Sequence, residues 1–203
     1  IKRVEDQRLL TGQGTYTDDV TPDGTARAFI LRSPYAHARI KGIDTADAEA
    51  APGVIAVLTN KHVQEDGLGD LPCLAPAPNK DGSARADTPR PILEGDRVRH
   101  VGTPVAMIIA ETLDQARDAS ELVDIEYEPL EAATDTEGAT RPGAAQLYDH
   151  IPHNVCFDWH KGDLEMAEAA FTRAKQVVRT KVVNNRIIVN SMEPRGAIGL
   201  YDA

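Results

Sequence analysis

The chain has 203 residues, 41% of them hydrophobic and 27% charged, and its 22 basic and 32 acidic side chains give a net charge of −10. These values are typical of a globular protein with one domain or one and a half. The acidic balance disfavours binding to a nucleic-acid backbone. No apolar run approaches the roughly 18 to 20 residues that span a bilayer, and the N-terminal residues are too charged for a secretory signal. We therefore expect a cytoplasmic protein without a membrane span.

A first strand–helix–strand unit is predicted from two extended runs, a short helix and an apolar strand, over residues 26–32, 36–43, 46–51 and 54–59. Asp44 or Thr45 can cap the helix. Pro52-Gly53 ends it, because proline cannot continue a helix and glycine accepts the left-handed cap. The next strand, Val-Ile-Ala-Val-Leu-Thr, is apolar and branched.

The same order returns further along the chain. Residues 104–110 form its most hydrophobic run, and Thr112 and Gln115 have the spacing of a capping box for a helix that extends to about Leu122. Residues 123–127 then alternate with period two, as a strand with one wet face does. The repetition predicts an α+β fold, a sheet with helices on one side.

Two loops and a terminal region complete the pattern. Residues 64–95 are rich in proline and glycine, and residues 131–152 in Ala, Gly, Thr and Pro, so both predict surface loops. Gly162-Asp163 can cap a helix over residues 164–173. Its predicted inner face consists of Leu164, Ala167, Ala170, Phe171 and Ala174, and strands are predicted over residues 176–183 and 197–202.

Motifs that could carry chemistry are weak. Gly12-Gln-Gly14 lacks the third glycine and the flanking elements of a dinucleotide site, so it predicts a turn. His150 and His153 could approach each other, but they lie in a predicted loop without further ligands and are interpreted as surface histidines. The two cysteines form no Cys-x-x-Cys pair, and no serine has the Gly-x-Ser-x-Gly setting of a hydrolase. We assign no catalytic residue and no metal ligand.

Glu193 and Arg195 are the polar residues of most interest. They flank Pro194 between apolar segments, so we expect them to be partly buried and to need partners. Two interpretations stay open. They form structural salt bridges, or they border a cofactor pocket.

Several segments, in one order, resemble the large, molybdenum-binding subunit of the aldehyde oxidase/xanthine dehydrogenase family, in the branch that contains carbon monoxide dehydrogenase. They cover residues 3–19, 32–40, 52–58, 98–106, 110–130 and 191–197. One departure is Thr103, where this branch commonly has Glu in a Gly-Glu-Pro-Val sequence. It leaves the family resemblance intact but weakens assignment to a particular member.

The resemblance implies a domain division. Residues 1–133 are expected to form an a/b hammerhead domain with an N-terminal arm, residues 134–160 a linker, and residues 161–203 the incomplete start of the molybdopterin-binding domain. It also implies an oxidoreductase that oxidises an aldehyde, a heteroaromatic compound or carbon monoxide with oxygen from water.

The implied cofactors are molybdopterin-bound molybdenum in the full-length subunit, with iron–sulfur clusters and FAD on partner subunits and none on this part alone. The implied partners are the remainder of the large subunit, the iron–sulfur subunit and the FAD subunit, commonly as a dimer of heterotrimers. The family's base lies outside this stretch, which is expected to be an inactive scaffold and subunit contact. The alternative is a stand-alone hammerhead-type binding or interaction module without catalysis.

Overall fold

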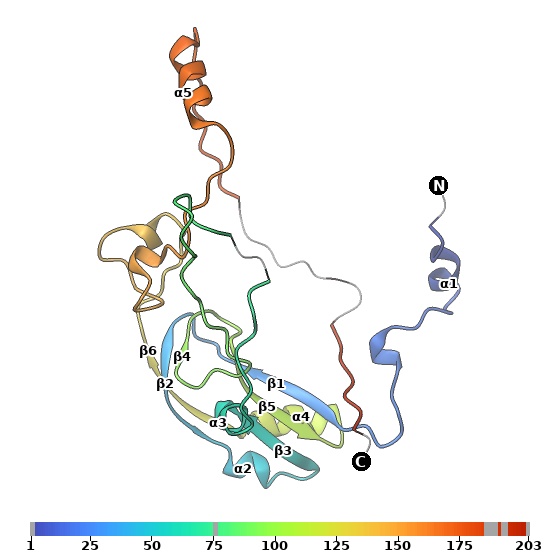
Figure 1. Cartoon of the computed structure of the whole chain (residues 1–203). Coiled ribbons are helices and arrows are strands. Elements are labelled where there is room, and N and C mark those ends of the chain that lie inside the picture. Colours follow the sequence, from blue (N-terminus) through green and yellow to red (C-terminus); the bar gives the residue numbers. More distant parts are fainter. Residues whose placement is uncertain (1–2, 75–76, 185–190, 192–194, 202–203) are drawn as a thin grey trace. The chain divides into compact units, whose positions relative to one another are not determined.

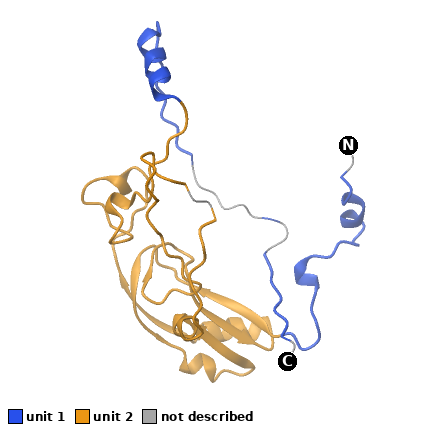
Figure 2. Cartoon of the chain, in the orientation of Figure 1, with its two compact units in different colours: residues 1–25, 163–203 blue, residues 26–162 orange. Residues whose placement is uncertain are grey.

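The computed structural model describes residues 3–74, 77–184, 191 and 195–201 (Figure 1). The chain divides into two compact units, residues 26–162 and residues 1–25 together with 163–203 (Figure 2). All strands assigned among the described residues lie in residues 26–162, which we call the sheet unit. The predicted fold is therefore compared with this unit.

The strands of the sheet unit form two antiparallel, three-stranded sheets. In one sheet β5 lies between β1 and β3, and their bounds are Pro104–Ala110, Arg27–Arg32 and Val54–Thr59. In the other, β2 lies between β4 and β6, and their bounds are Ala38–Asp44, Arg97–Val98 and Asp124–Pro129. Figure 1 shows the two groups of strands side by side.

Two strand–helix–strand repeats build these sheets. The first is β2, α2 (Ala46–Glu49) and β3, and the second is β5, α4 (Leu113–Ser120) and β6. Because β2 pairs with β6 and β3 pairs with β5, each repeat gives one strand to each sheet. The predicted α+β fold and its duplication are confirmed, and the structure adds that the strands divide between two sheets.

The core is organised around β5. Ala106, Ile108 and Ala110 are fully buried on the face that packs against α2 and α4. Val105 points to the other face, where it packs with Ala38 of β2 and Val98 of β4. The alternation of side chains along a strand thus lets one element contribute to two apolar clusters.

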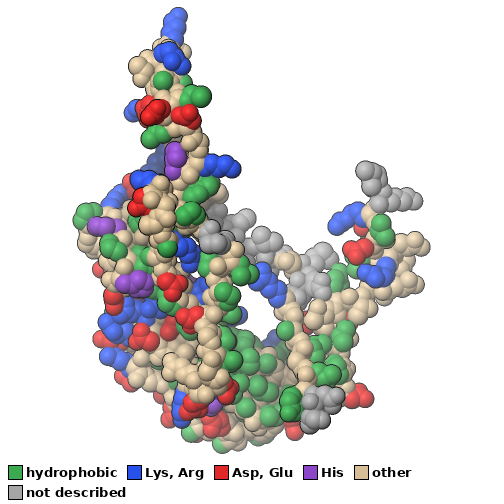
Figure 3. Space-filling model, viewed as in Figure 1, with side chains coloured by type: hydrophobic (Ala, Val, Ile, Leu, Met, Phe, Trp, Pro, Cys, Tyr) green, Lys and Arg blue, Asp and Glu red, His purple; other side chains and the backbone are tan. Residues whose placement is uncertain are grey.

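The second face of the β1–β5–β3 sheet is apolar but only partly buried. Ile30 and Leu58 both lie opposite Met107 in the register, and all three side chains are partly exposed. Figure 3 shows hydrophobic side chains gathered over the part of the sheet unit that holds β1 and β5, with acidic and basic side chains mixed elsewhere. A strand covered to some degree on both faces explains the continuous apolar run of β5.

The two repeats meet at Gly53. The predicted capping box is confirmed, because the Thr112 N–H donates to Gln115 Oε1 at 2.9 Å and the Gln115 N–H donates to Thr112 Oγ1 at 3.2 Å. Gly53 has a φ of +78°, and a Cβ atom there would overlap the Gln115 amide. Its carbonyl accepts the Glu111 N–H at 2.9 Å. This position therefore needs glycine both for its backbone angle and for the space.

We expect Gly53→Ala to destabilise the sheet unit more than Gly102→Ala. Gly102 has a similar φ of +89°, but a Cβ atom added there would have no neighbour within 4 Å. The control therefore costs about 1 kcal/mol of backbone strain, and Gly53→Ala costs about 1 kcal/mol more, because the Gln115 amide must move out of its capping contact with Thr112. Urea unfolding of both variants measures the difference. Equal losses would contradict the contact.

Two short elements were not anticipated from the sequence. Helix α3 (Asn60–Glu65) follows β3 directly, and its first turn is closed by the Thr59 N–H, which donates to His62 Nδ1 at 3.1 Å. A histidine takes the place that Glu or Gln has in the usual capping box. Strand β4 has only two residues, too few for a periodic signal. The loop was predicted over residues 64–95. Residues 64 and 65 belong to α3, and residues 66–95 form no helix or strand in their described part.

The predicted strands after α5 (Leu164–Arg173) are not formed. No strand occurs over residues 176–183 or 197–201, and residue 202 lies outside the described part. The valine-rich pattern of residues 176–183 fits a strand, but a β-ladder also requires a neighbouring strand. The prediction is therefore wrong for this structure.

Helix α5 itself begins where predicted, because Asp163 Oδ1 accepts the Met166 N–H at 2.8 Å. Its predicted inner face is not buried. Leu164 is 60% exposed and Phe171 59% exposed, so the apolar side of the helix is mostly open to solvent. The remaining helix of the same unit, α1 (Asp6–Leu10), also buries none of its residues.

Among the described helices, none combines the length and the apolarity that crossing a membrane requires.

Candidate functional site

The predicted site residues do not form a pocket in the described part of the chain. Arg195 is exposed, contrary to the expected partial burial, and Glu193 lies outside the described residues. His150 Nε2 lies 2.8 Å from the Asp87 carbonyl oxygen. Over the described ranges, no group of three or more His, Cys, Asp or Glu side chains could hold a metal ion.

The other candidate motifs occupy structural positions. Gly12 has a φ of +72° in a turn, as predicted. Glu126 and Glu128 both face solvent on β6, and Glu128 Oε2 lies 3.1 Å from Lys41 Nζ. Cys73 is exposed and Cys156 is partly buried. These described residues provide no donor set that fits a molybdenum or pterin group, and we derive no chemical step through one.

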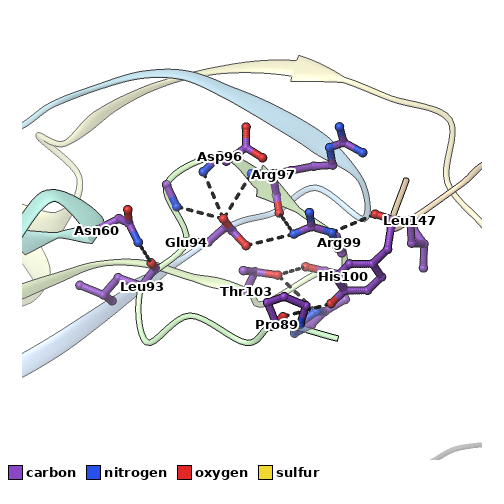
Figure 4. A network of polar contacts seen from close by, with 12 residues as sticks. Asn60, Pro89, Leu93, Glu94, Asp96, Arg97, Arg99, His100, Thr103 and Leu147 are labelled. Carbon is purple, nitrogen blue, oxygen red and sulfur yellow. Dashed lines mark hydrogen bonds and ion pairs between the residues drawn. The ribbon is translucent and has the colours of Figure 1, made fainter. Parts of the chain in front are cut away.

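The most densely connected polar site centres on Glu94, just before β4 (Figure 4). Its side chain is 9% exposed. Oε1 accepts the N–H groups of Gly95, Asp96 and Arg97 at 3.1, 3.1 and 3.3 Å. Oε2 accepts Nη1 of Arg99 at 3.2 Å. A buried carboxylate is costly unless its oxygens are bonded, and here both are.

Arg99 joins Glu94 to a second segment. Its Nη1 also donates to the Arg97 carbonyl at 2.8 Å, and its Nε donates to the Leu147 carbonyl at 2.9 Å. The guanidinium lies 4.5 Å from the centre of the Tyr148 ring, a cation–π distance. Burial raises the pKa of the Tyr148 phenol, although the Arg99 charge opposes the shift.

Arg97 holds the same segment through Asp149. Nη1 and Nη2 of Arg97 donate to Oδ1 and Oδ2 of Asp149 at 3.0 and 3.4 Å. The Arg97 side chain is 9% exposed and that of Asp149 79%. The hydrogen bond from Arg97, with its charge, lowers the pKa of Asp149, and the same bond raises the pKa of Arg97. We call Glu94, Arg97, Arg99, Tyr148 and Asp149 the polar lock.

The long loop over residues 66–95, which we call the arm, is tied to its surroundings. The Leu71 N–H donates to the Arg90 carbonyl at 2.8 Å, so the two limbs of the arm are joined. The Tyr148 hydroxyl donates to the Pro89 carbonyl at 3.2 Å. Glycine and proline content correctly predicted a loop, but it does not reveal these contacts.

Segment 32–40, one of those that resemble the family, contains the turn between β1 and β2, and hydrogen bonds hold this turn in place. The Ser33 N–H donates to the Thr103 carbonyl at 2.9 Å, and the Gly102 N–H donates to the Ser33 carbonyl at 2.8 Å. Thr103 Oγ1 donates to the His100 carbonyl at 2.7 Å. His37 Nδ1 lies 2.6 Å from the Glu131 carbonyl oxygen. These residues fix the crossing of the chain between the two sheets.

The polar lock was missed by sequence reasoning, although a signal exists. Glu94-Gly-Asp-Arg-Val-Arg99 sets an acid and two arginines beside a glycine, directly between the arm and the apolar β5. Except for Nε of Arg97, which is buried without a hydrogen-bond partner among the described residues, the arrangement matches donors with acceptors and leaves no side chain of the lock poised as a general base or nucleophile. It holds three segments of the sheet unit together.

We expect Glu94→Gln to lower the free energy of unfolding by about 2 to 4 kcal/mol, because it removes the charge that compensates the mostly buried Arg99. Glu128→Gln is the matched control. Its ion pair with Lys41 is half exposed, so the loss should stay below about 1 kcal/mol. Chemical denaturation measures both, and a neutral Glu94→Gln variant would contradict the role of the lock.

The Asp149 contact should weaken in acid. Its pKa is lowered in the folded state, so its stabilisation is present above the ordinary carboxylate pKa and is lost as pH falls through the lowered value. The difference in Tm between the native chain and Asp149→Asn should therefore be constant above about pH 5 and shrink below about pH 4. Asp118→Asn, an exposed residue without an ion pair to a described residue, should show no such change. A difference that grows in acid would refute the assignment.

Comparison with known proteins identifies the family of the chain. The family model described as "Aldehyde oxidase and xanthine dehydrogenase, a/b hammerhead domain" matches residues 11–131. The chain belongs to this family. The family resemblance and the hammerhead fold class inferred from the sequence are confirmed.

Individual relatives support the same family. The chain is 36% identical to the carbon monoxide dehydrogenase large chain of Afipia carboxidovorans, over 99% of this chain and 25% of the relative. It is also 36% identical to the nicotine 6-hydroxylase large subunit of Paenarthrobacter nicotinovorans, over 100% of this chain and 24% of the relative. The chain thus spans about a quarter of the length of these relatives.

Solved structures agree. Quinoline 2-oxidoreductase from Pseudomonas putida 86 matches with a TM-score of 0.66 and 39% identity, over 77% of this chain and 19% of that protein chain. Carbon monoxide dehydrogenase from Oligotropha carboxidovorans matches with a TM-score of 0.70 and 35% identity, over 87% and 22%. The relatives are oxidoreductases, and this family member covers only a part of them.

Proposed function

We propose that the chain is the N-terminal part of the large subunit of a molybdenum-dependent oxidoreductase, where it serves as a scaffold and subunit contact and is inactive alone. One observation carries this proposal. Similarity extends over 99% of this chain but only 25% of a carbon monoxide dehydrogenase large chain. A relationship that covers all of this chain and a quarter of the relative favours a part of a larger subunit over a complete enzyme.

The domain division proposed for this part is a hammerhead domain with its N-terminal arm over residues 1–133, a linker over 134–160, and the start of the cofactor-binding domain at 161. The family match over residues 11–131 supports the first section. The polar lock fastens Leu147, Tyr148 and Asp149 of the linker to β4. The first part of the linker would therefore be fixed on the sheet unit.

In the complete enzyme, bound molybdopterin and molybdenum would supply the oxidation of an aldehyde, a heteroaromatic compound or carbon monoxide with oxygen from water. Iron–sulfur and FAD subunits would accept the electrons, in a dimer of heterotrimers in the cytoplasm. The residues of this chain would contribute support. Their hydrogen bonds and apolar clusters would keep the sheet unit folded. The exposed apolar side of α5 would be a contact surface for the rest of the subunit.

A second candidate is a stand-alone hammerhead module that binds a partner without catalysis. It is favoured by the sheet unit, which has two apolar clusters and the polar lock within its own residues. This candidate requires a stop codon directly after residue 203. The first proposal requires a reading frame that continues for several hundred residues, in keeping with the length of the relatives.

Metal analysis separates the candidates. The 203-residue chain and the product of its full reading frame would each be expressed in a host that makes molybdopterin, together with the adjoining genes. We expect about one molybdenum per full-length large subunit and none in the 203-residue chain. Molybdenum, or turnover of an aldehyde, in the pure 203-residue chain would contradict the proposed scaffold role.

A further inference from the structure

Residues 155–159 lead out of the sheet unit and are hydrogen-bonded along one edge. The Cys156 carbonyl accepts the Ala86 N–H at 2.8 Å, and the Asp158 carbonyl accepts the Lys80 N–H at 2.7 Å. Lys80 Nζ also lies 2.6 Å from Asp158 Oδ2. These bonds fasten alternate residues of the segment to the arm.

The other edge is open. The Cys156 carbonyl and both peptide groups of Asp158 bond to the arm, the alternation that an extended chain gives, in which the peptide groups of Phe157 and Trp159 point to the opposite edge. Neither Phe157 nor Trp159 makes a backbone hydrogen bond with another described residue. A row of unpaired N–H and C=O groups is a template for an added strand.

An apolar stripe accompanies this edge. Val155, Phe157 and Trp159 are 45%, 42% and 55% exposed, and alternate residues of an extended chain lie on one face. Trp159 is the chain's single tryptophan. Exposed aromatic side chains beside unpaired backbone groups are the anchors that protein interfaces use.

We infer that residues 155–159 accept a β-strand from the part of the large subunit that follows residue 203. That strand pairs with the peptide groups of Phe157 and Trp159 and covers their side chains. The inference rests on the proposed function and deepens it, because it names the segment through which this lobe engages the rest of the subunit.

The rest of the subunit is the occupant for two reasons. The relatives are about four times as long as this chain, and the next element, α5, also exposes its apolar side, including Leu164 and Phe171 at 60% and 59%. Each of these apolar surfaces needs a cover, and the remainder of the same polypeptide can supply both. A strand on that polypeptide also avoids most of the entropy loss of bringing two molecules together.

Residue-resolved hydrogen exchange tests the strand addition. The 203-residue chain is compared with the full large subunit. The Phe157 and Trp159 amides should exchange at least about tenfold more slowly in the full subunit. The Asp158 amide donates to Asn79 Oδ1 at 2.8 Å within this chain, so it should keep its rate and serves as an internal control.

The outcomes separate the two proposals. A full subunit that holds molybdenum but leaves the Phe157 and Trp159 amides unprotected overturns the strand addition alone. A reading frame that stops after residue 203 overturns both. Protection that appears in the 203-residue chain and rises with its concentration assigns the edge to a second copy and also overturns the inference.

Side-chain variants add an independent test. Trp159→Ser should lower the Tm of the full subunit by roughly 2 °C and leave that of the 203-residue chain nearly unchanged, because the ring is fully buried only in the former and more than half exposed in the latter. Leu68→Ser, at a 55% exposed position on the arm, is the matched control and should change neither. An equal shift in both proteins for Trp159→Ser would contradict the inference.

Discussion

The burial of β5 is the constraint on which the sheet unit depends. Ala106, Ile108 and Ala110 face the helices, Val105 faces the second sheet, and all four side chains are fully buried. The strand also bonds to β1 on one side and β3 on the other. Because β5 contributes side chains to both apolar clusters, disruption of this strand would destabilise both. Small alanine side chains on α2 and α4 let the helices approach the strand closely enough to bury it.

The polar lock extends this organisation to segments that have little apolar surface of their own. Glu94 gathers three backbone N–H groups and Arg99, and the two arginines fasten residues 147–149. Residues 147–149 and the arm are therefore held by hydrogen bonds and ion pairs instead of by a core. Residues 155–159 are bonded to the arm separately, through the N–H groups of Ala86 and Lys80.

Local patterns made much of the fold predictable. The apolar run of residues 104–110, the capping box at Thr112 and the glycine at position 53 each specify backbone structure through neighbouring residues. The pairing of β2 with β6 and the lock between Glu94 and Arg99 depend on contacts that no local period encodes. The strands predicted over residues 176–183 failed for a related reason, since their pattern lacks a paired neighbour in the described chain. The predicted role of Glu193 and Arg195 stays a prediction.

The central claim is that the two sheets unfold as one cooperative unit, because each strand–helix–strand repeat contributes one strand to each sheet. Hydrogen exchange of the sheet unit under native conditions tests this claim most directly. We predict that the slowest amides of β5 and those of the β2–β6 pair exchange with the same free energy and the same dependence on denaturant, because both open only through global unfolding. A β2–β6 pair that opens separately, at a clearly lower free energy and with a smaller denaturant dependence, would contradict the account.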